Sequence, residues 1–231
     1  MNLYNYSSMS DKNVELLKNI LREIIDENKN LDFTKVKQIE IVNKLENISS
    51  DGKFENDVII LPMDKIESYI KCENINIIKS TIYHELCHAH LKTKLPFIHE
   101  LSQKYIKEEN YVKYFTIMVY IEYITHLMSV KYENKIIITN FLKSVNNIKW
   151  NFNNEESKIW YIKCLPYVLA RTKEKVEYLN IIDNKEFKDN CNEAKEIFNK
   201  FDKNNLIDDY KILNKLEKYV SNYITNNWKI N

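Results

Sequence analysis

The chain has 231 residues and a formal net charge of +1, with 44% hydrophobic and 29% charged residues. This composition is ordinary for a folded globular protein and argues against intrinsic disorder. The near-zero net charge does not favour binding to nucleic acid or to an anionic membrane. The sequence contains one glycine, Gly52, and three prolines. Since so few residues interrupt helices, we expect most of the chain to be helical.

The N-terminal part of the chain predicts one helix and two strands. Ser10 is a suitable N-cap for a helix from Asp11 to about Glu27, because its hydroxyl can accept a hydrogen bond from the first turn. Residues 36–42 are rich in β-forming side chains and predict a strand. A turn at 51–52 and a second strand at 58–61 follow, which indicates a small sheet or hairpin.

Two helices are predicted in the middle of the chain. The first runs from about Asn74 to Leu91 and ends before Pro96, because a proline disfavours helix in the residue ahead of it. The second spans about 111–132. Its apolar part contains one charged residue, Glu122, and resembles a membrane span. It is short for one and carries a Glu and a His, so we interpret it as a buried helix of a globular protein.

The last third of the chain predicts helices only. The three pieces are 155–180 with a kink at Pro166, 185–201, and 206–228. No internal repeat, low-complexity tract or linker separates them from the rest. The sequence therefore predicts a predominantly helical α+β protein.

One short motif carries the chemistry. Residues 84–88 read His-Glu-Leu-Cys-His, an HExxH pattern inside the expected helix. Side chains four residues apart on a helix share one face, with Cβ atoms about 6 Å apart, so His84 and His88 can bind one Zn²⁺. Glu85 lies about 100° around the helix from His84, beside the metal, where it can accept a proton from bound water. The alternative is an ordinary helix that happens to carry two histidines.

A catalytic zinc normally has three protein ligands and an open position for water. Glu122 is the strongest candidate for the third ligand, because a lone carboxylate in an apolar helix needs a counter-charge and zinc would supply it. A Lys, an Arg or His126 could instead pair with Glu122. His99 is a second candidate. We reject His90, because two residues beyond His88 it points to nearly the opposite face of the helix.

His126 has three interpretations. It lies one helical turn beyond Glu122 and could orient that carboxylate. It could instead stabilise the oxyanion that forms on a substrate carbonyl. The third interpretation is a purely structural histidine.

The compartment is predicted from the N-terminus and the cysteines. The first ten residues lack the basic and apolar segments of a secretory signal, so we expect a cytoplasmic location. The four cysteines form no CxxC pair, and in a reducing compartment they are predicted to be free thiols.

The motif and its surroundings resemble a known type of enzyme. The strand ending in Ile-Leu-Pro at 60–62 and the run Thr-Ile-Tyr-His-Glu-Leu-Cys-His at 81–88 are similar to the gluzincin type of zinc peptidase. Among these, the chain most resembles the compact intracellular ImmA/IrrE-like peptidases. Those often carry a Glu followed by a short run of hydrophobic and small residues, as at 122–129 here. The resemblance covers roughly residues 54–133.

The resemblance implies a site and a fold. His84, His88 and Glu122 would be the ligands of one Zn²⁺ per chain, Glu85 the catalytic base, and the substrate a protein, often a transcriptional repressor. The implied fold is a small N-terminal β-sheet or hairpin packed on a zincin-like active-site helix, followed by a helical C-terminal region. We expect one domain over 1–231, with a zincin-like core at 1–149 and a helical extension at 150–231.

Three functions follow as hypotheses. The leading one is a zinc metallopeptidase, in which zinc polarises the scissile carbonyl and Glu85 moves a proton from zinc-bound water to the leaving amine. The strand at 58–61 would be the sheet edge that pairs with an extended protein or peptide substrate. The second is a zinc-stabilised interaction module without catalysis, whose C-terminal helices bind a regulatory protein. The third is a SprT-like protease that acts on DNA-bound proteins. Residues 84–89 resemble the motif of that family, although its later His-Gly pair is absent. None of the three involves a membrane.

Overall fold

The structure is a computed structural model of the chain, and the protein is predominantly helical α+β, as predicted. The described residues are all of 1–231 except 47–50, 149–154, 174 and 225–231. The chain divides into two compact units, Met1–Thr93 with Lys131–Asn134, and Lys94–Val130 with Lys135–Asn231. The single domain with an extension from residue 150 stays a prediction.

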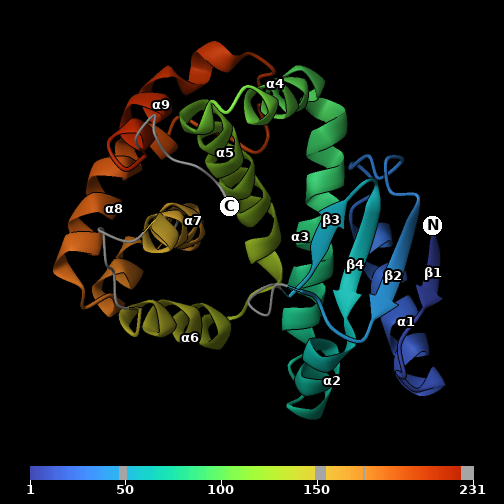
Figure 1. The fold of residues 1–231 in the computed structure, drawn as a ribbon. Coiled ribbons are helices and arrows are strands. Elements are labelled where there is room, and N and C mark those ends of the chain that lie inside the picture. Colours follow the sequence, from blue (N-terminus) through green and yellow to red (C-terminus); the bar gives the residue numbers. More distant parts are fainter. Residues whose placement is uncertain (47–50, 149–154, 174, 225–231) are drawn as a thin grey trace. The chain divides into compact units, whose positions relative to one another are not determined.

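The first unit contains a four-stranded sheet (Figure 1) in the order β1-β2-β4-β3. Its strands are β1 (Asn2–Asn5), β2 (Gln38–Val42), β3 (Lys53–Glu55) and β4 (Val58–Pro62). The pairs β1–β2 and β2–β4 are parallel, and β3–β4 is antiparallel. The sequence predicts a small sheet or a hairpin, and the structure contains the sheet. The interpretation of 58–61 as an edge strand is wrong, because β4 pairs on both sides and β3 lies at the edge.

The short strand β3 explains why β2 and β4 are parallel, because it reverses the chain between them. Its hairpin with β4 turns through Asn56 and Asp57, whose φ angles are 51° and 67°. Two-residue hairpin turns require such left-handed φ angles, and Asn and Asp adopt them more readily than most residues. The turn predicted at 51–52 lies before β3 and is not the hairpin turn.

The turn residue Asp57 makes the sheet sensitive to acid. Its carboxylate lies 2.6 Å from Nζ of Lys92 and 3.1 Å from Nζ of Lys37. The hydrogen bond from Lys92 holds the pKa of Asp57 below its ordinary value, and Lys37 adds to this effect. Since the folded state favours the charged form, the pair stabilises the protein above the unfolded pKa. That stability is lost as the pH falls through the lowered folded pKa.

We expect Asp57→Asn to lower the free energy of unfolding by about 1 kcal/mol at pH 7, because the charge is lost while the residue still suits the turn. The difference from wild type should shrink to zero as the pH falls well below 4, where the wild-type carboxyl is also protonated. Thermal unfolding of both proteins from pH 7 to pH 2 measures this. Glu55→Gln, in an exposed pair with Lys53, is the matched control and should have a smaller effect. A difference that stays constant with pH would contradict the ion-pair explanation.

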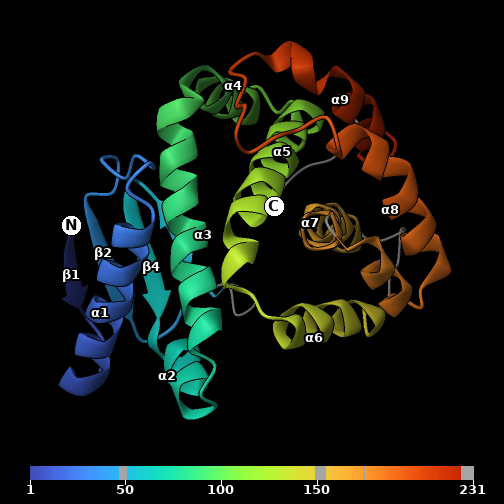
Figure 2. The ribbon, with the colours of Figure 1, turned by 180° about the vertical axis from the view of Figure 1, so that it is seen from behind.

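Helices α1 (Asp11–Glu27) and α3 (Ile75–Lys94) lie on the same face of the sheet (Figure 2), and α2 (Met63–Lys71) follows β4 directly. The Ser10 side chain accepts a hydrogen bond from the Asn13 amide, so the predicted N-cap is confirmed. Burial alternates along β2 and β4, which leaves one side of the sheet for the helices. Fully buried apolar side chains of this unit include Leu17, Ile24, Ile39, Ile41, Ile59, Leu61, Ile78 and Leu86.

The second unit is helical. It contains α4 (Pro96–Lys107), α5 (Tyr111–Ser129), α6 (Lys135–Asn146), α7 (Glu155–Thr172), α8 (Lys185–Phe198) and α9 (Asn214–Ser221). The 3-10 helices η2 (Val176–Ile181) and η3 (Tyr210–Leu213) accompany them, whereas the residues of η1 (Val130–Tyr132) are divided between the two units. Pro166 lies inside α7, but α7 ends at Thr172 and not at residue 180 as predicted. The predicted helix at 206–228 begins only at η3, and its last four residues lie outside the described ones.

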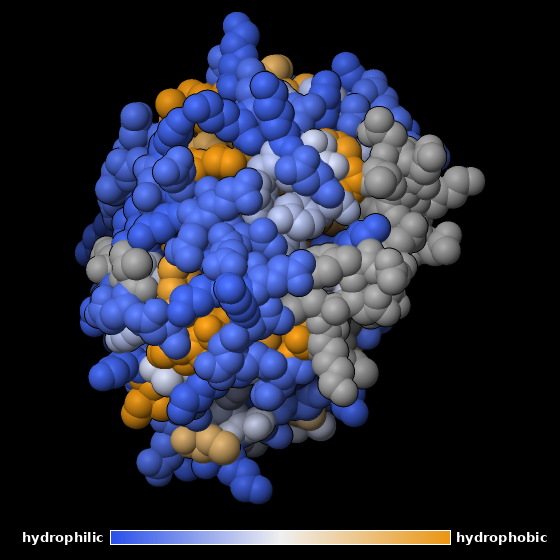
Figure 3. Space-filling view, turned by 90° about the vertical axis from the view of Figure 1, so that its left-hand side faces the viewer, coloured by the Kyte–Doolittle hydropathy of each residue, from blue (hydrophilic) through white to orange (hydrophobic). Residues whose placement is uncertain are grey.

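The predicted buried helix is α5, which packs against α4, α7 and α9. Fourteen of its 19 residues are buried, in agreement with its interpretation as a buried helix. None of the described helices combines the length and apolar character that a membrane crossing requires. Hydrophilic side chains cover most of the face seen in Figure 3, and the hydrophobic patches on that face are small and separate.

The start of α4 is held by a residue from much later in the chain. The carboxylate of Asp208 accepts hydrogen bonds from the backbone amides of Phe97 and Ile98, each at 2.9 Å. Pro96 occupies the first helical position, where its missing N–H costs no hydrogen bond. Asp208 thus acts as the cap that a side chain before the helix would normally provide.

Candidate metal centre

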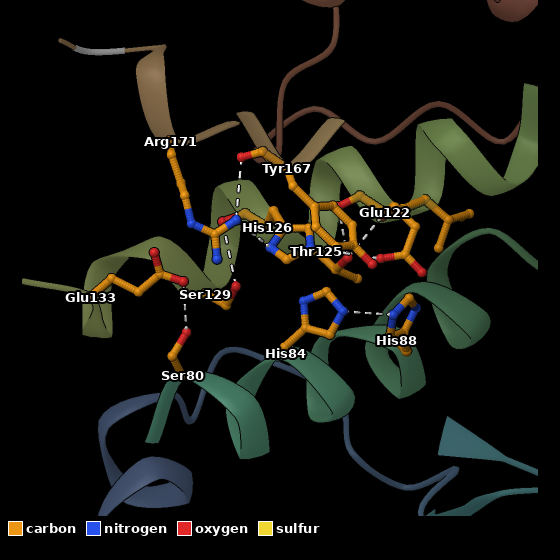
Figure 4. Close-up of polar contacts among 11 residues, drawn as sticks. Ser80, His84, His88, Glu122, Thr125, His126, Ser129, Glu133, Tyr167 and Arg171 are labelled. Carbon is orange, nitrogen blue, oxygen red and sulfur yellow. Dashed lines mark hydrogen bonds and ion pairs between the residues drawn. The ribbon is translucent and has the colours of Figure 1, made fainter. Parts of the chain in front are cut away.

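The two histidines of the HExxH motif, His84 and His88, lie side by side on helix α3. Ile82, Leu86 and Ala89 are buried in the core, whereas His84 and His88 are half-buried. The Nε2 atoms of His84 and His88 lie 3.0 Å apart (Figure 4). Two nitrogens bound to one tetrahedral zinc at about 2.0–2.1 Å would be roughly 3.3 Å apart. The spacing of the pair therefore suits a single ion.

Glu85, the predicted catalytic base, follows His84 on the same helix. Its side chain is buried, with 6% of the residue exposed. It lies beside the backbone of Gly52, in the segment that leads into β3. Glu85 is thus held within the first unit rather than extended into solvent.

Glu122 is placed by α5, whose N-terminus is capped by the side chain of Asn110. Its side chain is 19% exposed as a whole, but the carboxylate oxygen Oε2 is buried. The apolar surroundings are as expected, since Ile121 and Ile124 are buried. Burial raises the pKa of the nearby Tyr114 hydroxyl, and the negative charge of Glu122 raises it further.

His126 lies between Glu122 and Arg171 (Figure 4). Its Nε2 is 3.8 Å from Oε2 of Glu122, and its Nδ1 is 3.5 Å from a guanidinium nitrogen of Arg171. Because an arginine can only donate, Nδ1 must accept, and the ring hydrogen then lies on Nε2, facing the carboxylate. The His126 ring also packs on Tyr167, with centroids 3.9 Å apart. Of the three interpretations of His126, these contacts favour an orienting partner of Glu122.

Tyr167 and Arg171 are site residues that the sequence does not reveal. They lie one turn apart on α7, and Arg171 stacks over the ring of Phe141 at 4.2 Å. Stacking and the bond from Arg171 to the Tyr167 carbonyl at 3.3 Å fix the guanidinium opposite His126. No motif relates these positions to residue 126, so only the packing of α5 on α7 brings them together.

The predicted ligands come together as one group. One ligand atom from each of His84, His88 and Glu122 lies within 4.8 Å of the others, and the group could hold a metal ion. Two imidazoles and a carboxylate are a donor set that zinc accepts, and a fourth position would remain for water. The residues present thus fit the predicted cofactor.

The other histidines of the region have different positions. His90 is buried and its Nδ1 accepts a hydrogen bond of 2.9 Å from the Asp32 amide, so its exclusion as a ligand agrees with its structural contact. His99 is on α4 and does not belong to the ligand group found among the described residues.

The four cysteines are free thiols, as predicted. Cys87, inside the motif, is fully buried in the core. Burial also raises the pKa of the Cys164 thiol to about 12. No cysteine belongs to the ligand group found among the described residues.

Comparison of the chain with protein-family models, with curated proteins and with solved structures finds no match.

Proposed function

We propose that the protein is a cytoplasmic zinc metallopeptidase of the gluzincin type, most similar to the ImmA/IrrE-like peptidases, that hydrolyses peptide bonds in a protein substrate. The observation that carries the proposal is the group formed by His84, His88 and Glu122. The Nε2 atoms of the two histidines lie 3.0 Å apart, and a carboxylate oxygen of Glu122 lies within 4.8 Å of the histidine ligand atoms. The HExxH pattern supports Glu85 as the base, because Glu85 directly follows the ligand candidate His84.

Each residue has a distinct role in this proposal. A bound zinc ion would polarise the substrate carbonyl and make water more acidic. Glu85 accepts the proton of the attacking water and then donates it to the leaving amine. Its buried position next to His84 suits a group that must take up and release a proton beside the ligands. His126, held by Arg171, orients the carboxylate of Glu122.

The sheet of the first unit supports a peptide as the substrate. Among the described strands, β3 pairs only with β4, so its other edge carries backbone groups that an extended chain can pair with. Lys53 and Glu55 point to one side of β3 and form an ion pair at 2.8 Å. A peptide added to β3 would be held by its main chain, which favours a protein substrate over a small molecule.

The direct test is metal-dependent hydrolysis by the full chain. We expect purified protein to contain about one zinc per chain and to cleave an unfolded protein such as casein, with the fragments identified by mass spectrometry. Dialysis against 1,10-phenanthroline should reduce cleavage to background, and one equivalent of zinc should restore it. Cleavage that continues in the metal-free protein would contradict the proposal.

A further inference from the structure

The only glycine of the chain lies next to the proposed base. Gly52 is buried and directly precedes β3. Its φ angle is not positive, so its backbone conformation is one that other residues adopt as well. The need for glycine at this position must therefore come from space rather than from backbone freedom.

The space is limited by two side chains of α3. A Cβ atom at position 52 would lie 3.2 Å from both Cγ and Oε1 of Glu85, and 3.1 Å from Cγ2 of Thr81. These distances are tighter than ordinary van der Waals contact, so one of the neighbours would have to move by a few tenths of an ångström. Thr81 and Glu85 are four residues apart and share one face of the helix, so both would be displaced from the same side.

The residues on both sides of Gly52 make contacts within the first unit. The carboxylate of Asp51 lies 3.9 Å from Nζ of Lys65 and is hydrogen-bonded to the hydroxyl of Tyr69, both on α2. On the other side, Lys53 pairs with Ile60 in the β3–β4 hairpin. A side chain at position 52 would therefore push against Glu85 and Thr81 instead of shifting its own segment.

We propose that Gly52 is a positioning residue for Glu85. Because position 52 has no side chain, the segment entering β3 lies directly against the carboxylate and fixes it beside His84. The catalytic consequence rests on the proposed peptidase function, since general-base catalysis requires the base within about 0.5 Å of its productive position. The steric coupling between residues 52 and 85 does not depend on any reaction.

The coupling is tested by thermal unfolding in a double-mutant cycle. We expect Gly52→Ala to lower the melting temperature of the wild-type protein by roughly 3–10 °C, as other overpacked sites do. In the Glu85→Ala background, where Cγ and Oε1 are absent, the same change should lower the melting temperature by clearly less, because only the contact with Thr81 remains. Lys53→Ala, at the neighbouring exposed position, is the matched control and should show no coupling to residue 85. An equal shift from Gly52→Ala in both backgrounds would overturn the inference.

Hydrolysis measurements then separate the two proposals. We expect Gly52→Ala to keep its zinc and its KM while kcat falls about 10- to 100-fold, because the base is displaced and the ligands are not. Unchanged kcat in Gly52→Ala, or loss of zinc, would overturn the positioning role even if Glu85→Gln is inactive. If the zinc-loaded wild type cleaves no peptide, the peptidase proposal fails. The melting temperatures still decide whether Gly52 positions Glu85.

Discussion

Replacing Glu85 with glutamine is expected to stop peptide hydrolysis while leaving zinc in the protein. Glutamine has nearly the same shape, so the buried side chain next to Gly52 should still fit. Its amide cannot take a proton from water, and it cannot deliver one to the leaving amine. General acid–base catalysis is worth about 10²–10⁴-fold, and we expect kcat to fall by about 10³-fold. The measurement is kcat on an unfolded protein substrate together with the zinc content of the same sample.

The control for this prediction is Glu100→Gln, which changes an exposed glutamate of α4 and should leave both kcat and zinc content unchanged. Full turnover in Glu85→Gln would remove Glu85 as the base. The same variant separates a peptidase from a zinc-stabilised interaction module. The module would lose thermal stability when zinc is removed but would bind its partner equally well with Glu or Gln at position 85.

The second large effect is expected on zinc binding. We expect Glu122→Ala and His84→Ala to lower zinc affinity by at least about 100-fold, because loss of an outer partner of a ligand alone costs 10- to 100-fold. The loss of a direct ligand also leaves the two remaining donors unable to complete a three-residue site. Metal content after dialysis against a zinc buffer, measured by mass spectrometry, gives the result for each variant.

The matched control is His99→Ala, because His99 is the other candidate for the third ligand and lies outside the observed group. This variant should retain about one zinc per chain. Zinc that stays bound in Glu122→Ala but leaves His99→Ala would assign the third ligand to His99. Circular dichroism of each variant shows whether the helix content of the chain is retained.

The helices with strong local signals could be predicted from the sequence. The N-cap Ser10 places α1 correctly, and the HExxH helix α3 is three residues longer than expected at its C-terminal end. Helix α4 is not predicted from the sequence. A proline such as Pro96 can follow the end of one helix, but it can also be the first residue of the next helix. The sequence alone does not distinguish these two roles.

The short strand β3 could not be predicted from the sequence. β3 has only three residues, Lys-Phe-Glu, too few for an alternating pattern to stand out. Without β3, strands β2 and β4 look like consecutive partners of a hairpin, although they are parallel. Gly52 similarly looks like a turn residue. The sequence does not show that Thr81 and Glu85 occupy the space where a side chain at position 52 would lie.

The ligands of the candidate site could be proposed from spacing, but their supporting residues could not. His84 and His88 follow from the helical repeat, and Glu122 from an isolated charge in an apolar helix. Arg171 is one of many cations in the chain, and its position opposite His126 follows only from the packing of α7 on α5. Local patterns thus predict the donors, whereas tertiary packing determines how they are held.

The hydrogen bonds from Phe97 and Ile98 to Asp208 join residues about 110 positions apart. If the chain were cut between α8 and Asp208, the first amides of α4 would lose these acceptors and would have to be satisfied by water. A fragment designed to keep only the motif and its neighbours would begin α4 with an open end. The C-terminal third is therefore part of the scaffold that an expression fragment must retain, and not a detachable tail.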